Sequence, residues 1–84
     1  MPEYFITFRS VTGAQQGARL LGRAGVTYQL GRTPKSISAL GCGYALRVRP
    51  NDAARAVGLL RRDGAPFQKV YQFPYGGVPA EVVI

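Results

Sequence analysis

The chain has 84 residues, of which 46% are apolar and 18% charged, and it carries a net charge of +7. A chain of this length is typical of one globular domain, because it buries only about 60% of its unfolded surface and leaves no room for a second core. Histidine is absent, and the chain holds one cysteine and four carboxylates. These counts exclude a zinc site and a Cys–His or Ser–His–Asp catalytic group built within the chain. We therefore expect no metal, no cofactor and no enzyme active site.

The sequence also predicts the cellular compartment of the protein. The first residues, Met1-Pro2-Glu3, lack the basic region of a signal peptide. No apolar run approaches the ~18 residues that span a bilayer. One cysteine excludes an internal disulfide. We expect a cytoplasmic protein that makes no membrane contact, and its positive charge favours an acidic partner: a nucleic acid, an acidic protein or an anionic metabolite.

The first half of the chain predicts a strand, a helix and a second strand. Tyr4–Arg9 is rich in β-branched and aromatic residues, as strands are. Thr12 is a good helix N-cap, and Gln15 three residues later completes a capping-box pattern. Gly25 stands where a helix usually ends in the left-handed conformation. Val26–Leu30 then alternates between apolar and polar side chains and is predicted to be the second strand.

The second half repeats this order. Tyr44–Arg49 alternates and predicts a third strand. Asn51 is the predicted cap of a second helix, and Asp52 suits the positive end of its dipole. Gly64 ends that helix, and Phe67–Phe73 is the predicted fourth strand.

The resulting order, βαββαβ, predicts a ferredoxin-like α+β domain. Such a domain has a four-stranded antiparallel sheet with two helices on one face. A shift of 39 residues superposes Gly25 on Gly64, as expected if each βαβ half copies the other. We assign residues 1–73 to this domain and 74–84 to a C-terminal tail that forms a short strand, docks on a partner or is disordered. The helix residues predicted to pack on the same sheet face are Ala18, Leu21, Val57 and Leu60.

The segment 32–43 holds the single cysteine, Cys42, on a glycine-rich turn after the second strand. Arg32 and Lys35 favour the thiolate and would lower the pKa of the Cys42 thiol below its free value of about 8.5. An exposed, activated thiol could carry out sulfur chemistry, whereas a buried cysteine would be a small hydrophobic packing residue. Both readings fit the residues alone. The loop residues that would support a reactive thiol are Pro34, Lys35, Ser36, Ser38, Gly41 and Gly43.

A second candidate site is the open face of the sheet. Arg9, Arg47 and Arg49 are predicted to lie there, on the first and third strands. RNA-recognition modules stack bases on aromatic residues of the central strands, and the third strand has Ala45 and arginines at these positions. This argues against nucleic-acid binding by stacking. The alternatives for this face are a solvated surface, a homodimer interface, or a basic surface that binds an acidic protein, an anionic ligand or nucleic acid.

Three stretches resemble a known family: Phe8-Arg9-Ser10, Thr33 to Ser38, and Cys42-Gly43. The family is a small prokaryotic one, whose members are described as selenium/sulfur carrier protein-like or as domains of unknown function. The resemblance covers about residues 4–72. It implies that Cys42 transiently carries sulfur or selenium as a persulfide or selenopersulfide. It also implies protein partners that donate and accept this atom, such as a cysteine desulfurase.

A carrier of this kind requires few functional groups in the chain. It needs an accessible thiol with a lowered pKa and a surface on which its partners dock, but no internal general base. We therefore predict a non-enzymatic sulfur or selenium carrier that uses Cys42. The alternative prediction is a binding or adaptor module that uses its basic sheet face.

Overall fold

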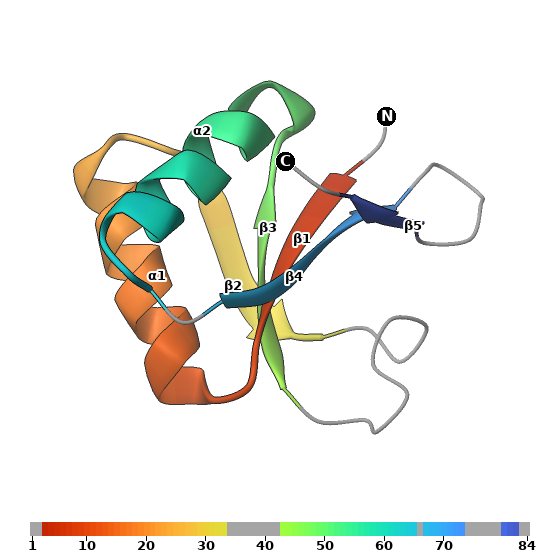
Figure 1. Cartoon of the computed structure of the whole chain (residues 1–84), viewed down its shortest axis with the longest axis horizontal. Coiled ribbons are helices and arrows are strands. Elements are labelled where there is room, and N and C mark those ends of the chain that lie inside the picture. The colour runs from red at the N-terminus through yellow and green to blue at the C-terminus, as the bar shows by residue number, and fades with distance from the viewer. Residues whose placement is uncertain (1–2, 34–42, 66, 74–79, 83–84) are drawn as a thin grey trace.

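The chain forms two helices and five strands in the computed structural model, which describes residues 3–33, 43–65, 67–73 and 80–82 (Figure 1). The elements are β1 (Glu3–Phe8), α1 (Val11–Arg23), β2 (Tyr28–Arg32), β3 (Tyr44–Val48), α2 (Pro50–Arg62), β4 (Phe67–Phe73) and β5 (Ala80–Val82). The first six follow the predicted βαββαβ order. The ferredoxin-like fold class is confirmed.

All neighbouring strands pair antiparallel, in the spatial order β2-β3-β1-β4-β5. The first four strands make the predicted sheet, and β5 adds a fifth by pairing with β4 at the edge, with Val70 opposite Val82. Of the three alternatives for the tail, the structure has a short strand at 80–82. Residues 74–79 and 83–84 lie outside the described residues.

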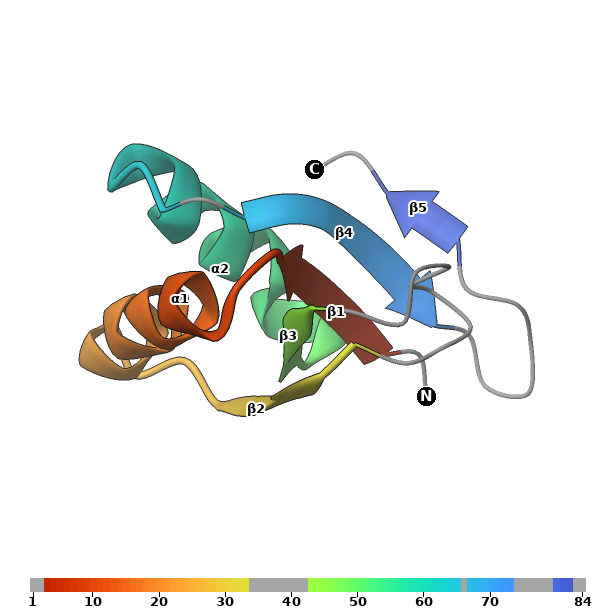
Figure 2. The ribbon, with the colours of Figure 1, turned by 90° about the horizontal axis from the view of Figure 1, so that it is seen from below.

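The core lies between one face of the sheet and the two helices, which both cover that face (Figure 2). Ile6 and Phe8 of β1 are buried on this side. The four helix residues expected on the same sheet face all belong to the core. Its largest fully buried side chains are Phe8, Ile6, Leu21, Leu46, Leu60 and Val57.

The cap of α1 is Ser10, so the predicted cap at Thr12 is wrong. Ser10 has extended backbone angles, and its Oγ accepts a hydrogen bond from the backbone N–H of Gly13 at 3.1 Å. The helix begins at Val11, which places Thr12 inside the first turn. Ser10 is as good a cap type as threonine. Ser10 rather than Thr12 is the cap because β1 ends at Phe8 and the chain turns directly after it.

The cap of α2 was also predicted too late. Arg49 occupies the N-cap position, without a side-chain hydrogen bond, and Pro50 is the first helical residue. Proline suits this position, because its fixed φ is helical and its missing N–H would have no partner there. Asn51 lies within the helix, whereas Asp52 is in the first turn as predicted. At the other ends of the two helices, Gly25 has the predicted left-handed conformation, with φ at 75°, and Gly64, predicted to end the second helix, has a φ of 70°.

The second strand begins two residues later than predicted. Val26 is buried but outside β2, because its backbone N–H donates to the Leu21 carbonyl at 2.9 Å. This bond holds the chain against the end of α1. Pairing with β3 begins only at Tyr28, opposite Val48, and continues to Arg32, opposite Tyr44.

Candidate functional site

The loop between β2 and β3 contains most of the residues predicted to carry the chemistry. Gly43 is described, as are Arg32 and Thr33 where the loop leaves β2. The other predicted residues lie outside the described residues: Pro34, Lys35, Ser36, Ser38, Gly41 and Cys42. The structure therefore describes the base of this loop.

The two ends of the loop meet at one end of the sheet. The backbone N–H of Thr33 donates to the Gly43 carbonyl at 3.2 Å, one step beyond the last β2–β3 pair. In β1, Phe8 lies opposite Tyr44. We call this end, formed by Phe8, Arg32, Thr33, Gly43 and Tyr44, the loop end of the sheet. The segment between β2 and β3 thus starts and finishes at the end of the sheet where β1 ends, and Gly43 lies beside Phe8.

Gly43 is fixed by the backbone of β1. Its φ is +109°, in the region that favours glycine. A β-carbon at this position would lie 2.9 Å from the carbonyl oxygen of Phe8. Real β-carbons essentially never come so close to a backbone atom. The residue that follows Cys42 must therefore be glycine for the chain to enter β3 along this path.

Thr33 is a residue of the loop base that the sequence did not single out. Its Oγ1 is buried and has no hydrogen-bond partner among the described residues. This oxygen lies 3.5 Å from the position that a β-carbon on Gly43 would occupy. A buried hydroxyl normally has a partner. Thr33 lies one step beyond the last β2–β3 pair, opposite Gly43, and this position can be recognised only when the β2–β3 register is known.

The first turn of α1 lies at the same end, because only Arg9 and Ser10 separate it from Phe8. This turn contains no acidic residue. Arg9 and Lys69 line a surface depression of about 480 Å³ beside it. Lys69 forms an exposed ion pair with Glu81 at 3.4 Å, whereas Arg9 is exposed and has no ion pair with any described carboxylate. The loop end therefore presents positive charge.

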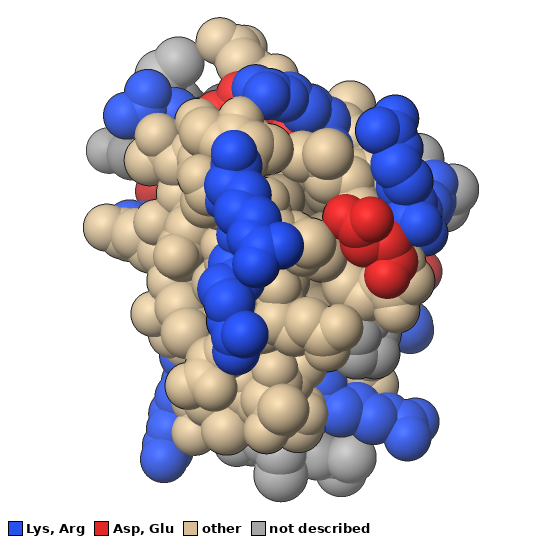
Figure 3. Space-filling view, turned by 90° about the vertical axis from the view of Figure 1, so that its left-hand side faces the viewer, with Lys and Arg blue, Asp and Glu red and all other residues tan. Residues whose placement is uncertain are grey.

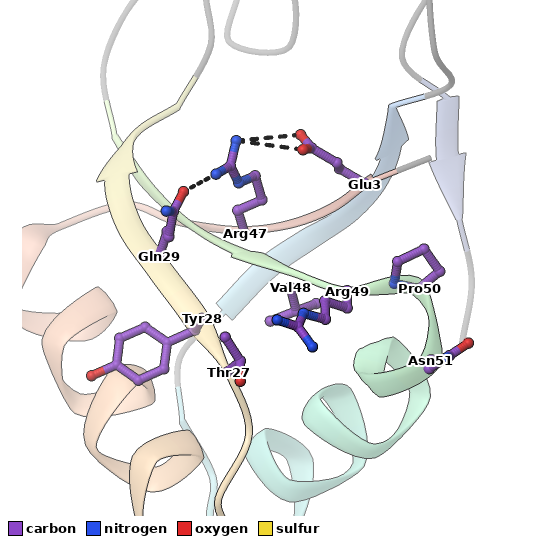
Figure 4. A pocket seen from close by; sticks show the side chains of 9 residues that line it. All are labelled: Glu3, Thr27, Tyr28, Gln29, Arg47, Val48, Arg49, Pro50 and Asn51. Carbon is purple, nitrogen blue, oxygen red and sulfur yellow. Dashed lines mark hydrogen bonds and ion pairs between the residues drawn. The ribbon is translucent and has the colours of Figure 1, made fainter. Parts of the chain in front are cut away.

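Arg47 and Arg49, the other two members of the predicted basic face, lie at the opposite end of the sheet from Arg9. They line one pocket of about 590 Å³, between the start of β2 and the start of α2 (Figure 4). Arg47 donates a hydrogen bond to Gln29 and forms an ion pair with Glu3 at 3.5 Å. The structure brings Arg47 and Arg49 together, but not with Arg9.

Positive charge is also present on the helices. Lysine and arginine side chains are spread over the side of the molecule that lies at the left of Figure 1 (Figure 3). The exposed helix arginines are Arg19, Arg23, Arg55, Arg61 and Arg62. Arg55 donates a hydrogen bond to the carbonyl of Ala24 at 2.7 Å, and Arg61 lies over the ring of Phe67. The charge of the protein is thus distributed around it rather than gathered on the open sheet face.

Two further searches of the structure concern metal and membrane. Within the described ranges, no group of three or more cysteine, aspartate or glutamate side chains is arranged to hold a metal ion. Neither of the two described helices is long and apolar enough to cross a membrane.

The fold is that of a small ferredoxin-like domain, and the residues that flank the cysteine-containing segment 34–42 meet at one end of its sheet. The chain belongs to the family described as "Putative Se/S carrier protein-like", which matches residues 3–72. This match confirms the resemblance seen in the sequence. Searches of curated proteins and of solved structures gave no match.

Proposed function

We propose that the chain is a carrier that holds a sulfur or selenium atom on Cys42 as a persulfide or selenopersulfide. The observation that carries this proposal is the family match over residues 3–72, since the family's description names selenium and sulfur carriage. Cys42 is the single cysteine of the chain and hence the one thiol that could take this role. A carrier role is also compatible with a chain that catalyses no reaction of its own.

The geometry of the loop base supports this role. Gly43, the residue that follows Cys42 in the chain, lies against the Phe8 carbonyl at the loop end of the sheet. The described residue next to the proposed carrier position is therefore fixed by the backbone of β1.

Electrostatics at this end favour a negatively charged sulfur. Arg9 and Arg32 are exposed cations there, and the first turn of α1 has no acidic residue to offset its dipole. Cations and helix N-termini lower the pKa of a nearby thiol. The Thr33 hydroxyl adds a donor that has no partner among the described residues. We expect these groups to stabilise the Cys42 thiolate and the persulfide anion that replaces it.

The proposed reaction is a thiol exchange that needs no oxidant. The Cys42 thiolate attacks the terminal sulfur of a donor persulfide, R–S–S⁻, and the donor thiolate R–S⁻ leaves. The product is Cys42–S–S⁻, and a donor R–S–Se⁻ gives Cys42–S–Se⁻ by the same step. An acceptor thiolate or other nucleophile then attacks the terminal atom and regenerates the Cys42 thiolate. Each step breaks one S–S or S–Se bond and forms one new bond to the transferred atom.

The test is to expose the purified protein to a sulfur donor and to measure its intact mass. The protein is incubated with a cysteine desulfurase and cysteine, and its intact mass is measured before and after a reductant is added. We expect one added sulfur atom, which the reductant removes, and no addition to the Cys42→Ser variant. Alkylation of the wild-type thiol across pH should show a pKa below about 8.5. A protein that gains no sulfur, and whose thiol reacts only after unfolding, would assign Cys42 to packing.

A second candidate function is the binding of an anionic partner in the pocket that contains Arg47 and Arg49. The observation that favours it is the N-terminus of α2, which opens on this pocket with no side-chain cap. One observation argues against this function: Arg47 already forms an ion pair with Glu3 and a hydrogen bond with Gln29. Binding to nucleic-acid phosphates weakens steeply as salt rises. If no RNA or DNA is bound even at about 50 mM salt, where such binding is favoured, the nucleic-acid form of this candidate fails.

A further inference from the structure

One edge of the sheet is unprotected. Within the described part of the chain, β2 pairs on one side only, with β3, and its register is regular throughout. Its residues from Gln29 to Arg32 are all exposed. Natural proteins guard such edges with charged residues, prolines or bulges, because an edge offers free N–H and C=O groups to another strand. Tyr28 to Gly31 include none of these devices, and the one charged residue of β2, Arg32, lies at its last position.

The register shows which backbone groups of β2 point outward. Opposite residues in an antiparallel pair alternate between hydrogen-bonded and non-hydrogen-bonded pairs. Thr33 bonds to Gly43, so Gly31 with Ala45 and Gln29 with Arg47 are also hydrogen-bonded pairs. The intervening residues therefore direct their N–H and C=O groups away from β3. These residues are Tyr28, Leu30 and Arg32.

The outward groups are self-complementary about Leu30. If a second β2 strand approaches antiparallel with Leu30 opposite its own copy, Tyr28 of each strand lies opposite Arg32 of the other. All three pairs then join outward-facing residues, so each can exchange two N–H···O=C bonds. No two like charges are placed opposite one another, and each Arg32 guanidinium meets a Tyr28 ring, which attracts a cation.

Leu30 provides the apolar centre of this arrangement. Its side chain lies on the helix-covered face, opposite Leu46, yet 40% of it is exposed. Two Leu30 side chains brought together across a two-fold axis would cover each other. Of the large hydrophobic side chains that are described, Val11 is the other exposed one, at 39%, and it lies in the first turn of α1 rather than on a strand edge.

We propose that the partner of the β2 edge is a second copy of this chain. The two copies form a two-fold dimer by antiparallel pairing of their β2 strands about Leu30, which makes one continuous sheet across both domains. Each copy contributes one strand of five residues to the interface, so the buried area falls at the low end for specific complexes and we expect a weak, concentration-dependent dimer. Both copies carry a charge of +7, so added salt screens their repulsion and favours the dimer.

The pairing engages one residue of the loop end, Arg32, which lies opposite Tyr28 of the partner. β2 runs toward the loop end at Arg32, so antiparallel strands direct the two loop ends in opposite directions. The two proposals are tested by different measurements, sulfur loading by mass and dimerisation by sedimentation, so the failure of one is distinguishable from the failure of the other.

The first test is the oligomeric state of the full chain by sedimentation velocity, over about 10 µM to 1 mM and at low and high salt. We expect a monomer–dimer equilibrium that shifts toward the dimer with salt. Leu30→Lys places two ammonium groups opposite each other and should weaken the dimer by about tenfold or more. Val11→Lys adds the same charge at a site with matched exposure and should leave the equilibrium unchanged. A monomer at every concentration overturns the proposal, as does a dimer that both variants form equally.

The second test locates the pairing. In the Cys42→Ser background, Leu30→Cys places one thiol at the two-fold axis. Opposite residues in a hydrogen-bonded pair have Cα atoms about 5.5 Å apart, within the range that a disulfide bridges. Mild oxidation should yield a disulfide-linked dimer, whereas Val11→Cys in the same background should not cross-link. A dimer in solution that Leu30→Cys fails to link would show that another surface forms it.

Discussion

The carbonyl oxygen of Phe8 lies 2.9 Å from the position that a β-carbon on Gly43 would occupy, where φ is +109°. This contact joins the end of β1 to the first residue after Cys42. Gly43→Ala should therefore destabilise the protein by about 1–3 kcal/mol, through backbone strain and the clash. Urea unfolding followed by circular dichroism measures this change. Gly31→Ala is the control, because nothing lies within 4 Å of a β-carbon there. Equal stability of the two variants would contradict the assigned path of the loop base.

Thr33→Val removes the Thr33 hydroxyl but keeps the shape of the side chain, so it tests the role of the hydroxyl alone. The buried Thr33 hydroxyl has no partner among the described residues, and an unpaired buried hydroxyl costs about 1–3 kcal/mol, so its removal should not lower the free energy of unfolding. The same change removes a donor that we expect to favour the Cys42 thiolate, so the pKa of that thiol should rise. Alkylation rates across pH report the second effect, and Thr33→Ser is the control that restores the donor. A variant that loses stability, with an unchanged pH profile, would assign the Thr33 hydroxyl to folding alone.

Two helical glycines should respond to alanine with opposite signs. Both changes gain up to about 1 kcal/mol of helix propensity. At Gly58 nothing lies within 4 Å of the added β-carbon, so Gly58→Ala should stabilise the protein. At Gly17 the added carbon would lie 2.8 Å from the buried ring of Phe8, so Gly17→Ala should destabilise it, since overpacking typically costs about 1–3 kcal/mol. Denaturant midpoints measure both. Two equally stabilised variants would show that Phe8 does not pack against α1 in this way.

The corrected cap of α1 can be tested with two substitutions two residues apart. Ser10→Ala removes the oxygen that accepts from the Gly13 N–H and should cost about 0.5–2 kcal/mol. Thr12→Ala changes an exposed residue within the helix and should be neutral or slightly stabilising, because alanine is the better helix former. Thermal unfolding of both variants gives the comparison. If Thr12→Ala were less stable than Ser10→Ala, Thr12 rather than Ser10 would be the cap of α1.

The order of elements could be predicted from the sequence because strand alternation and helix-ending glycines are local signals. Both αL glycines, Gly25 and Gly64, were found in this way. The helix starts were predicted late because several residues nearby are good caps, and the end of the preceding strand decides among them. At α2, Pro50 was the better signal. Val26 was misplaced because a β-branched residue can be buried against a helix end as readily as in a strand.

The candidate site was only partly predictable. The importance of Gly43 followed from its place beside Cys42, but its physical reason, the Phe8 carbonyl, depends on a pairing between β1 and β3 that no local pattern reveals. The same holds for Thr33. Arg9 and Arg49, which the sequence assigns to one face, each follow the C-terminal end of a strand. They lie at opposite ends of the sheet, because β1 and β3 run antiparallel.

The most direct measurement of the central claim, a transferable sulfur on Cys42, is cyanolysis of the loaded protein. Cyanide attacks the terminal sulfur of a persulfide, R–S–S⁻, and yields thiocyanate and R–S⁻, so the thiocyanate released counts the carried sulfur atoms. After loading by a cysteine desulfurase and removal of free sulfide, we expect one thiocyanate per chain from the wild-type protein and none from Cys42→Ser. No thiocyanate from the wild type, or equal amounts from both proteins, would contradict the carrier role of Cys42.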